Sequence, residues 1–349
     1  MAPVGVIGWF EDIGLRDRPQ VGGKGGSLGE LVRAGIAVPP GFVVRTVAFE
    51  QFIASLEGQA PVRARVQALR ADDLDSIRSC AADLRARLRA APLPPELSVE
   101  LTTSHGALCE RAGQADVAVR SSATTEDASD ASFAGLQDTY LWVADARRML
   151  ERLRDCWASL YSVESISYRR HRGIAEREVA MGVVVQAMVD SRAAGVMFTR
   201  SPTSGDRSVV TIEGAWGLGS AVVGGEVTPD RWVLGKITGE ISVREISEKH
   251  IEHRRARAGG VETVEVDAAR RVEPCLDDAQ LEQLRQVARQ VERHYGCAQD
   301  IEWAIDTRGQ LLLLQSRPET VWSARDAAPA ARASADPLAH VMSIFGGRR

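Results

Sequence analysis

Residues 300–318 read DIEWAIDTRGQLLLLQSRP, which is two apolar runs on either side of a short polar segment. Apolar and polar residues alternate in the first run, and residues 306–309 (DTRG) have the composition of a tight turn. The pattern therefore predicts a β-hairpin with strands at 300–305 and 310–316.

The predicted hairpin would gather four polar side chains. Side chains alternate between the two faces of a strand, so Asp300 and Glu302 share a face, as do Gln315 and Arg317 after the turn. Carboxylate and amide oxygens suit Mg2+, which keeps several waters and bridges nucleotide phosphates. An exposed sheet face with a surface ion pair is the simpler interpretation of the same pattern.

A glycine-rich segment near the N-terminus, GGKGG at 22–26, surrounds Lys24 with glycines and leads into a helical pattern through Leu28 and Leu31. Free backbone N–H groups and the helix dipole favour an anion at such a place. Lys24 is followed by glycine rather than serine or threonine, so the segment does not match the Walker A motif. A phosphate-binding loop and a flexible turn both remain open.

An arginine followed by hydroxyl groups marks the next segment. Arg120 comes directly after the apolar run 117–119 and precedes SSATT at 121–125. A guanidinium fork together with hydroxyls is suited to holding phosphate oxygens. The residues at 124–127 could equally cap a helix.

Two further motifs have weaker signals. GAWGLG at 214–219 matches only part of a dinucleotide-binding fingerprint, and a third glycine-rich loop in a phosphate-binding cleft fits it better. TSH at 103–105 resembles a phosphoacceptor motif, but His105 falls in a helical stretch, and we interpret it as an ordinary helix-surface histidine. His250 and His253 lie in a charged stretch and are interpreted as solvated.

The remaining pattern predicts alternating helices and strands. Residues 62–112 favour a helical hairpin, and 145–161, 162–172 and 277–295 favour helices. Strands are expected at 117–119, 136–142, 179–189, 195–199, 208–213 and 231–234.

Composition excludes several classes of protein. The formal net charge is -4 and charges of both signs are mixed, so no basic face indicates binding to nucleic acid or an anionic membrane. No apolar run approaches the ~20 residues that cross a bilayer, and we expect no membrane association. The five cysteines are widely spaced without a CxxC pair, which favours a reduced, cytoplasmic setting.

Taken together, the motifs resemble one family, the N-terminal nucleotide-binding domain of phosphoenolpyruvate synthase, pyruvate phosphate dikinase and rifampicin phosphotransferase. The blocks that carry the resemblance are VGGKGGSLG at 21–29, VRSSATTED at 119–127, ASFAG at 131–135, GVMFT at 195–199, WGLG at 216–219, TPD at 228–230, DIEW at 300–303 and QSRP at 315–318. Several motifs in the family's order are more specific than any one of them.

The resemblance implies an α+β fold of the ATP-grasp type, in which two lobes clasp ATP and Mg2+. The lobes would comprise residues 1–190 and 191–322, followed by a linker or tail at 323–349. One departure from the family's pattern is Ser220, where an acidic residue is expected after Gly-Leu-Gly. The resemblance therefore implies no role for that side chain.

The resemblance also implies roles for individual residues. Lys24, Arg120 and Arg317 would neutralise phosphate charge as the catalytic cations. Glu302, Gln315 and Asp300 would surround the metal. The residues implied to bind the nucleotide are Lys24, Arg120, Gly135, Thr139, Gln186, Glu302, Gln315 and Arg317.

In that family ATP is split into AMP and phosphate, and the β-phosphoryl is left on a histidine of a swivelling domain. This sequence contains no such domain, so the resemblance implies a separate partner subunit, as in phenylphosphate synthase, which would phosphorylate a phenol-type compound or pyruvate. An ATP-binding regulatory protein without phosphoryl transfer is a second interpretation. A self-sufficient ATP-grasp kinase or ligase that acts on a small molecule is a third.

Overall fold

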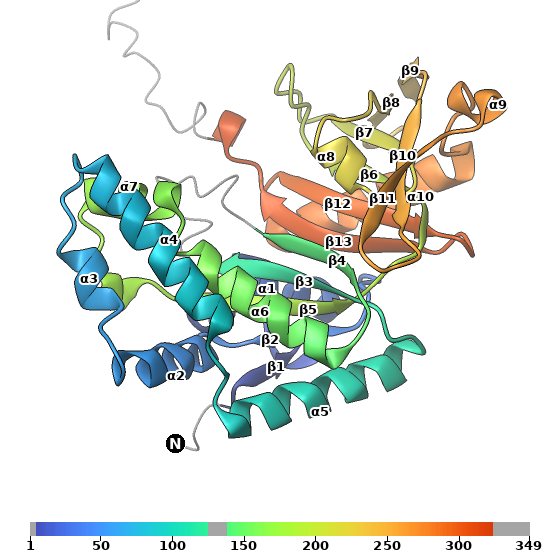
Figure 1. Cartoon of the computed structure of the whole chain (residues 1–349). Coiled ribbons are helices and arrows are strands. Elements are labelled where there is room, and N and C mark those ends of the chain that lie inside the picture. Colours follow the sequence, from blue (N-terminus) through green and yellow to red (C-terminus); the bar gives the residue numbers. More distant parts are fainter. Residues whose placement is uncertain (1–4, 125–137, 324–349) are drawn as a thin grey trace, which may run out of the picture.

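The computed structural model describes residues 5–124 and 138–323. Its strands form two main antiparallel sheets that lie side by side (Figure 1). The N-terminal sheet has the order β1-β2-β5-β3-β4, and the C-terminal sheet has the order β13-β12-β6-β7-β8-β9. The strands are β1 (Ile7–Trp9), β2 (Gly41–Val44), β3 (Val117–Ala123), β4 (Thr139–Val143), β5 (Met181–Ala187), β6 (Ser191–Phe198), β7 (Val209–Trp216), β8 (Asp230–Gly235), β9 (Ile241–Glu245), β10 (Ile251–Arg255), β11 (Val261–Glu265), β12 (Gln299–Asp306) and β13 (Leu311–Pro318).

Most helices surround the N-terminal sheet, whereas α8 to α10 accompany the C-terminal sheet (Figure 1). The helices are α1 (Arg18–Arg33), α2 (Thr46–Glu57), α3 (Arg63–Gln67), α4 (Leu74–Ala90), α5 (Pro95–Ala112), α6 (Ala146–Ser159), α7 (Val163–Arg172), α8 (Ser220–Val223), α9 (Ala268–Arg271) and α10 (Asp278–Tyr295), with short 3-10 turns at η1 (Phe10–Asp12), η2 (Leu15–Asp17) and η3 (Glu176–Glu178). Apart from Leu136 and Gln137, which lie outside the described residues, the predicted helices and strands are found within a few residues of their expected bounds.

Apart from α2, a helix of 12 residues with a buried apolar face, the elements that the sequence pattern did not predict are short or exposed. Strands β9 and β11 are five residues long and largely solvent-exposed, and each contains only two apolar residues, which is a weak signal for a strand. Strand β2 is buried on both faces, and a short apolar run of that kind does not distinguish a strand from a helix.

Two hydrophobic cores stabilise the two sheets. The core of the N-terminal sheet includes Trp157, which stacks on Phe52 with ring centroids 5.1 Å apart. The core of the C-terminal sheet includes the fully buried Trp232 and Trp303. Helix α10 covers that core with apolar residues at helical spacing, and its N-terminus is closed by a capping box between Asp277 and Gln280. The proposed lobe boundary at 190/191 falls in the short link between β5 and β6.

Helix α1 contacts both sheets and contains the glycine-rich segment. The segment is buried inside the helix, so the expectation of a loop ahead of the helix is corrected: only Gly22 leaves the helical conformation, with a φ of 73°. A Cβ at Gly22 would lie 2.0 Å from the carbonyl oxygen of Ser122, which explains why the chain needs glycine there. The Ser122 hydroxyl fixes the kink, because it donates to Val21 O and accepts from Gly25 N.

A second connection between the sheets is the β10–β11 hairpin, which we call the strap. Its Arg255 pairs with Asp116, 2.7 Å away, next to the N-terminal sheet. Beyond β10, Gly260 N donates to Trp142 O over 3.4 Å, and Arg148 of α6 donates to Ala258 O over 3.3 Å. The two sheets are therefore joined both by the link after β5 and by the strap.

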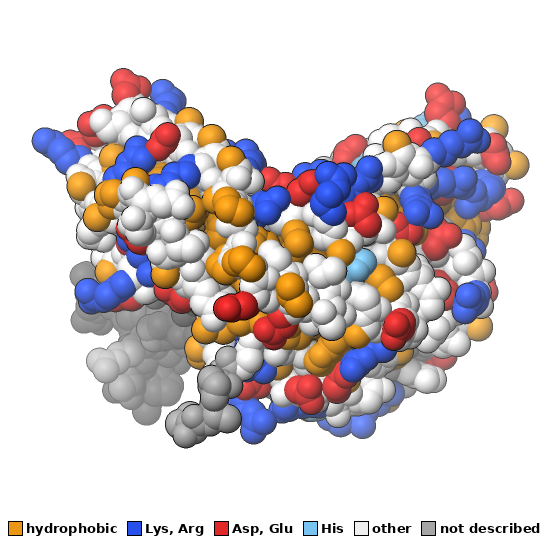
Figure 2. All heavy atoms as spheres, turned by 60° about the horizontal axis from the view of Figure 1, so that its bottom comes forward, with side chains coloured by type: hydrophobic (Ala, Val, Ile, Leu, Met, Phe, Trp, Pro, Cys, Tyr) orange, Lys and Arg blue, Asp and Glu red, His pale blue; other side chains and the backbone are white. Residues whose placement is uncertain are grey.

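Acidic and basic side chains are mixed over the face of the molecule that Figure 2 shows. Neither sign dominates that face, and hydrophobic side chains gather near its centre. Among the described residues, no helix combines the length and apolar character that a membrane span requires.

Candidate active site

A cavity of about 430 Å3 lies between the two sheets, beside the link from β5 to β6. This volume is in the range of small-molecule sites. Its apolar lining comprises Ala118, Leu141, Ala187, Met188, Val189, Leu218, Val223, Trp303 and Leu314, and its polar side chains are Arg120, Thr139, Gln186, Ser191, Ser220 and Glu302. The cavity thus combines an apolar portion with a few polar groups.

Arg120 connects the two sheets at the polar end of this cavity. It extends from β3, its side chain is only 10% exposed, and it lies 2.8 Å from Glu302 Oε2 on β12. The same terminal nitrogen donates to Gln315 Oε1 at 2.8 Å, and the other donates to Leu314 O at 2.9 Å. The Nε of Arg120 has no hydrogen-bond partner among the described residues. A buried guanidinium with an unused donor is suited to an anionic ligand.

The β12–β13 hairpin brings together the four polar residues predicted to share a face. In its register Glu302 is opposite Gln315 and Asp300 is opposite Arg317. Arg317 Nε lies 3.4 Å from Asp300 Oδ2, while Glu302 and Gln315 both contact Arg120. A β-bulge follows Glu302.

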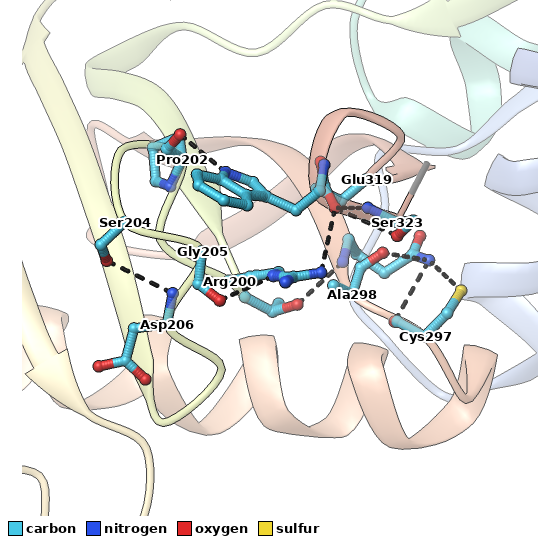
Figure 3. Close-up of polar contacts among 12 residues, drawn as sticks. Arg200, Pro202, Ser204, Gly205, Asp206, Cys297, Ala298, Glu319 and Ser323 are labelled. Atoms are coloured by element: carbon cyan, nitrogen blue, oxygen red, sulfur yellow. Dashed lines mark hydrogen bonds and ion pairs between the residues drawn. The ribbon is translucent and has the colours of Figure 1, made fainter. Parts of the chain in front are cut away.

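The end of the hairpin opposite its turn is fixed by a buried ion pair that the sequence pattern did not predict. Arg200, which follows β6, lies 3.9 Å from Glu319, and both side chains are less than a tenth exposed. Arg200 Nε donates to Gly205 O, and Glu319 accepts from the backbone of Trp322 and Ser323 (Figure 3). These contacts hold the end of β13 against the loop at 200–206.

Asp300 has an open acceptor in this polar group. Burial raises the pKa of its carboxyl from 3.8 to about 6, although Arg317 acts in the opposite direction. Its Oδ1 is buried without a hydrogen-bond partner among the described residues. With Glu302 and the amide oxygen of Gln315, this gives a donor set of hard oxygens that fits Mg2+.

The protein supplies only part of a coordination shell here. Within residues 5–124 and 138–323, no group of three or more His, Cys, Asp or Glu side chains is arranged to hold a metal ion. Mg2+ fits this partial set, because it usually retains waters and takes further oxygens from substrate phosphates.

Replacement of Asp300 by asparagine should stabilise the ligand-free protein above pH 6. A raised folded-state pKa means that the folded protein retains a proton that the unfolded chain releases, so wild-type stability falls as the pH rises from 3.8 to about 6. Asparagine cannot ionise and avoids this loss, which amounts to at most about 3 kcal/mol. Denaturant unfolding of both proteins between pH 4.5 and 8 measures the difference.

The matched control is Asp206→Asn. The pKa of Asp206 is lowered by hydrogen bonds from Ser208, so its contribution to stability is lost as the pH falls and the variant should show the opposite trend. A stability difference for Asp300→Asn that does not change with pH would contradict the prediction.

The other predicted site residues occupy different positions. Thr139 and Gln186 line the cavity, and Gln186 Nε2 donates to Pro39 O at 3.2 Å. Lys24 is buried within α1 and does not line the cavity. Burial raises the pKa of the Cys156 thiol well above its ordinary value, and the charge of Lys24 acts on that pKa in the opposite direction. Gly135 lies outside the described residues.

Two interpretations of histidines are wrong. His105 lies on α5 as expected, but it is 6% exposed rather than on the helix surface, and burial lowers its pKa. His253 is 7% exposed rather than solvated. Its Nδ1 lies 2.8 Å from Ser220 Oγ, and its Nε2 lies 3.3 Å from Glu226 Oε2. Both contacts come from residues that follow β7 and meet β10 only in the folded chain. The charged residues around His253 in the sequence therefore give no sign of them.

Comparison with known proteins assigns this chain to a family. Residues 18–336 match the family described as pyruvate phosphate dikinase, AMP/ATP-binding domain. The chain belongs to this family. The match and the two-sheet architecture confirm the prediction of an α+β fold of the ATP-grasp type.

The curated relatives are longer than this chain. The chain is 40% identical over 316 residues to a probable phosphoenolpyruvate synthase of Methanothermobacter thermautotrophicus, covering 90% of this chain and 46% of that protein. It is 41% identical over 312 residues to a rifampicin phosphotransferase of a Streptomyces species, covering 89% and 35%. The chain therefore spans about half or less of these relatives.

Among solved structures, D-alanyl-alanine synthetase A from Vibrio cholerae aligns with 69% of this chain and 54% of its own. The identity is 12% and the TM-score is 0.26.

Proposed function

We propose that this family member binds ATP with Mg2+ in the cavity between the sheets and cleaves it to AMP and phosphate, passing the β-phosphoryl to a histidine on a partner subunit. The observation that carries the proposal is Arg120, whose buried guanidinium meets Glu302 and Gln315 at the polar end of an otherwise largely apolar cavity. The apolar portion suits a nucleobase, and the polar end suits phosphates.

The residues at the polar end would act mainly by positioning and by neutralising charge. Phosphoryl transfer develops negative charge over the phosphate oxygens, and fixed cations in a site shielded from water stabilise it. Arg120 would supply a planar fork of donors, and Lys24 and Arg317 would add positive charge around it. Thr139, Gln186 and Gly135 would contact the nucleotide.

Asp300, Glu302 and Gln315 would hold Mg2+, which supplies charge neutralisation of the phosphate oxygens when it is bound. The Arg120–Glu302 pair would then have to open, so that the guanidinium turns to phosphate and the carboxylate to the metal. In the ligand-free protein the pair keeps both charges satisfied.

The partner subunit would carry the phosphohistidine on a swivelling domain and deliver the phosphoryl group to a small acceptor. The relatives named above are a phosphoenolpyruvate synthase and a rifampicin phosphotransferase, each about twice as long as the matched region or longer. A phenol-type compound, as in phenylphosphate synthase, and pyruvate are the two acceptors that we propose to test. The chain would act in the cytoplasm.

The test measures the transfer of a radiolabelled phosphoryl group from ATP. We expect β-labelled ATP to label a histidine-bearing partner only when this protein and Mg2+ are present, with AMP and phosphate released. Lys24→Ala should abolish the transfer. Lys236→Ala is the matched control, because Lys236 is also buried but pairs with Glu292 and has no part in the proposed function.

Two other outcomes would favour the remaining interpretations. ATP binding without AMP formation, with or without a partner, would overturn the transfer step and indicate a regulatory protein. AMP formation by this chain alone with a small-molecule acceptor would indicate a self-sufficient enzyme.

A further inference from the structure

Ser220 stands at the edge of the cavity, at the start of α8 and directly after the glycine-rich loop. It is half-buried, and it also lines a second, more polar hollow of about 830 Å3 that contains His253. Its hydroxyl therefore lies between the cavity and a buried imidazole. The proposed function leaves this residue without a role.

The hydrogen bonds around His253 determine what Ser220 offers to the cavity. His253 Nε2 faces the Glu226 carboxylate at 3.3 Å, and a carboxylate can only accept, so the ring proton belongs on Nε2. In the neutral ring Nδ1 is then unprotonated and accepts, so the Ser220 hydroxyl donates its proton to it over 2.8 Å. The lone pairs of Ser220 Oγ remain available, so the side chain presents an acceptor to a ligand.

The backbone holds this arrangement in place. Leu218 N donates to His253 O at 3.0 Å, which attaches the loop before Ser220 to the same residue that orients its hydroxyl. Gly217 has a φ of 74°, and a Cβ there would lie 2.5 Å from His253 O. The loop and the strand therefore approach closely only because residue 217 is glycine.

We infer that Ser220, oriented by His253 and Glu226, accepts a hydrogen bond from a sugar hydroxyl of the bound nucleotide and so selects nucleotides that carry this hydroxyl over those that lack it. The inference rests on the proposed function, because it places a nucleotide in the cavity. Phosphates at Arg120 and a base against the apolar lining leave the sugar between them, and a sugar hydroxyl is a donor that matches an acceptor at the cavity edge.

The experiment compares the binding of ATP, 2′-deoxy-ATP and 3′-deoxy-ATP by isothermal titration calorimetry, using the full chain with Mg2+. We expect one of the deoxy analogues to bind about fivefold to tenfold more weakly than ATP, the effect of one lost hydrogen bond. Ser220→Ala should lower ATP affinity by a similar factor and bind all three nucleotides equally. Ser220→Thr, which keeps the hydroxyl, should keep the preference.

A further variant tests whether His253 positions the Ser220 hydroxyl or only supports the fold. His253→Phe leaves the Ser220 hydroxyl in place but free to rotate, so the ratio of ATP to deoxy-ATP affinity should fall while the phosphate contacts at Arg120 persist. The control is Ser242→Ala, a serine on β9 that bonds Val233 O away from the cavity.

The outcomes distinguish the inference from the proposed function. Equal affinity of wild-type protein for all three nucleotides, or an undiminished preference in Ser220→Ala, would overturn the role of Ser220 and leave nucleotide binding intact. No binding of any of the three nucleotides would overturn the proposed function, and the inference with it.

Discussion

Arg120→Lys is expected to lower partner-dependent AMP formation by about 10³-fold, the scale on which removal of a preorganised arginine or oxyanion donor acts. Lysine keeps the charge, but a single ammonium cannot replace two terminal nitrogens that reach Glu302, Gln315 and Leu314 O at once. The loss should appear mainly in kcat, since part of the charge that attracts ATP remains.

The measurement is the initial rate of AMP release with saturating ATP, Mg2+ and the partner. Arg231→Lys is the matched control, because Arg231 also extends from a strand and pairs with a glutamate, Glu245, at 3.2 Å, but lies outside the cavity. A rate for Arg120→Lys within tenfold of wild type would show that the guanidinium does not act on the phosphates.

Asp230→Ala is expected to destabilise the protein by about 3–5 kcal/mol, because it leaves a buried charge without its partner. Asp230 and Lys249 are fully buried, and their charged atoms are 2.6 Å apart. The carboxylate also accepts from Ser247 N and Cys275 N, both at 2.9 Å. The substitution therefore leaves a buried ammonium without its counter-charge and two backbone donors without their acceptor.

Equilibrium unfolding in urea measures this loss. Asp306→Ala is the control: Asp306 also accepts backbone hydrogen bonds, from Arg308 and Gln310, but at an exposed turn, so it should cost far less. The double variant Asp230→Ala/Lys249→Met should recover part of the stability, since no unpaired charge remains. A double variant less stable than Asp230→Ala would contradict this account.

The sequence pattern predicted the β12–β13 hairpin well because the residues that specify it are close together along the chain. Alternation and turn residues within nineteen positions, 300–318, specify both strands and the face that Glu302 and Gln315 share. The Arg120 contact is different, since Arg120 and Glu302 are 182 positions apart and meet only after both sheets have formed. The family resemblance, rather than any local pattern, associated these residues.

The sequence pattern does not indicate that Lys249 and His253 are buried. Lys249 and His253 lie in a stretch rich in Glu, Lys and Arg, which is typical of a solvated surface. Both are buried because a specific partner satisfies each, Asp230 for the lysine and Ser220 for the histidine. The partners come from segments about 20 and about 30 residues away, so no periodicity could have identified them.

The strap has a mechanical consequence for the cavity. A single covalent link would let one sheet turn about it in any direction, but the sheets are also attached where Arg255 meets Asp116 and where Gly260 meets Trp142. Two points of attachment define a line, and rotation about that line is the only relative movement that strains neither. Opening of this protein to exchange its ligand would therefore proceed by rotation about that line, and it would also have to break the contacts that α1 and Arg120 make between the sheets.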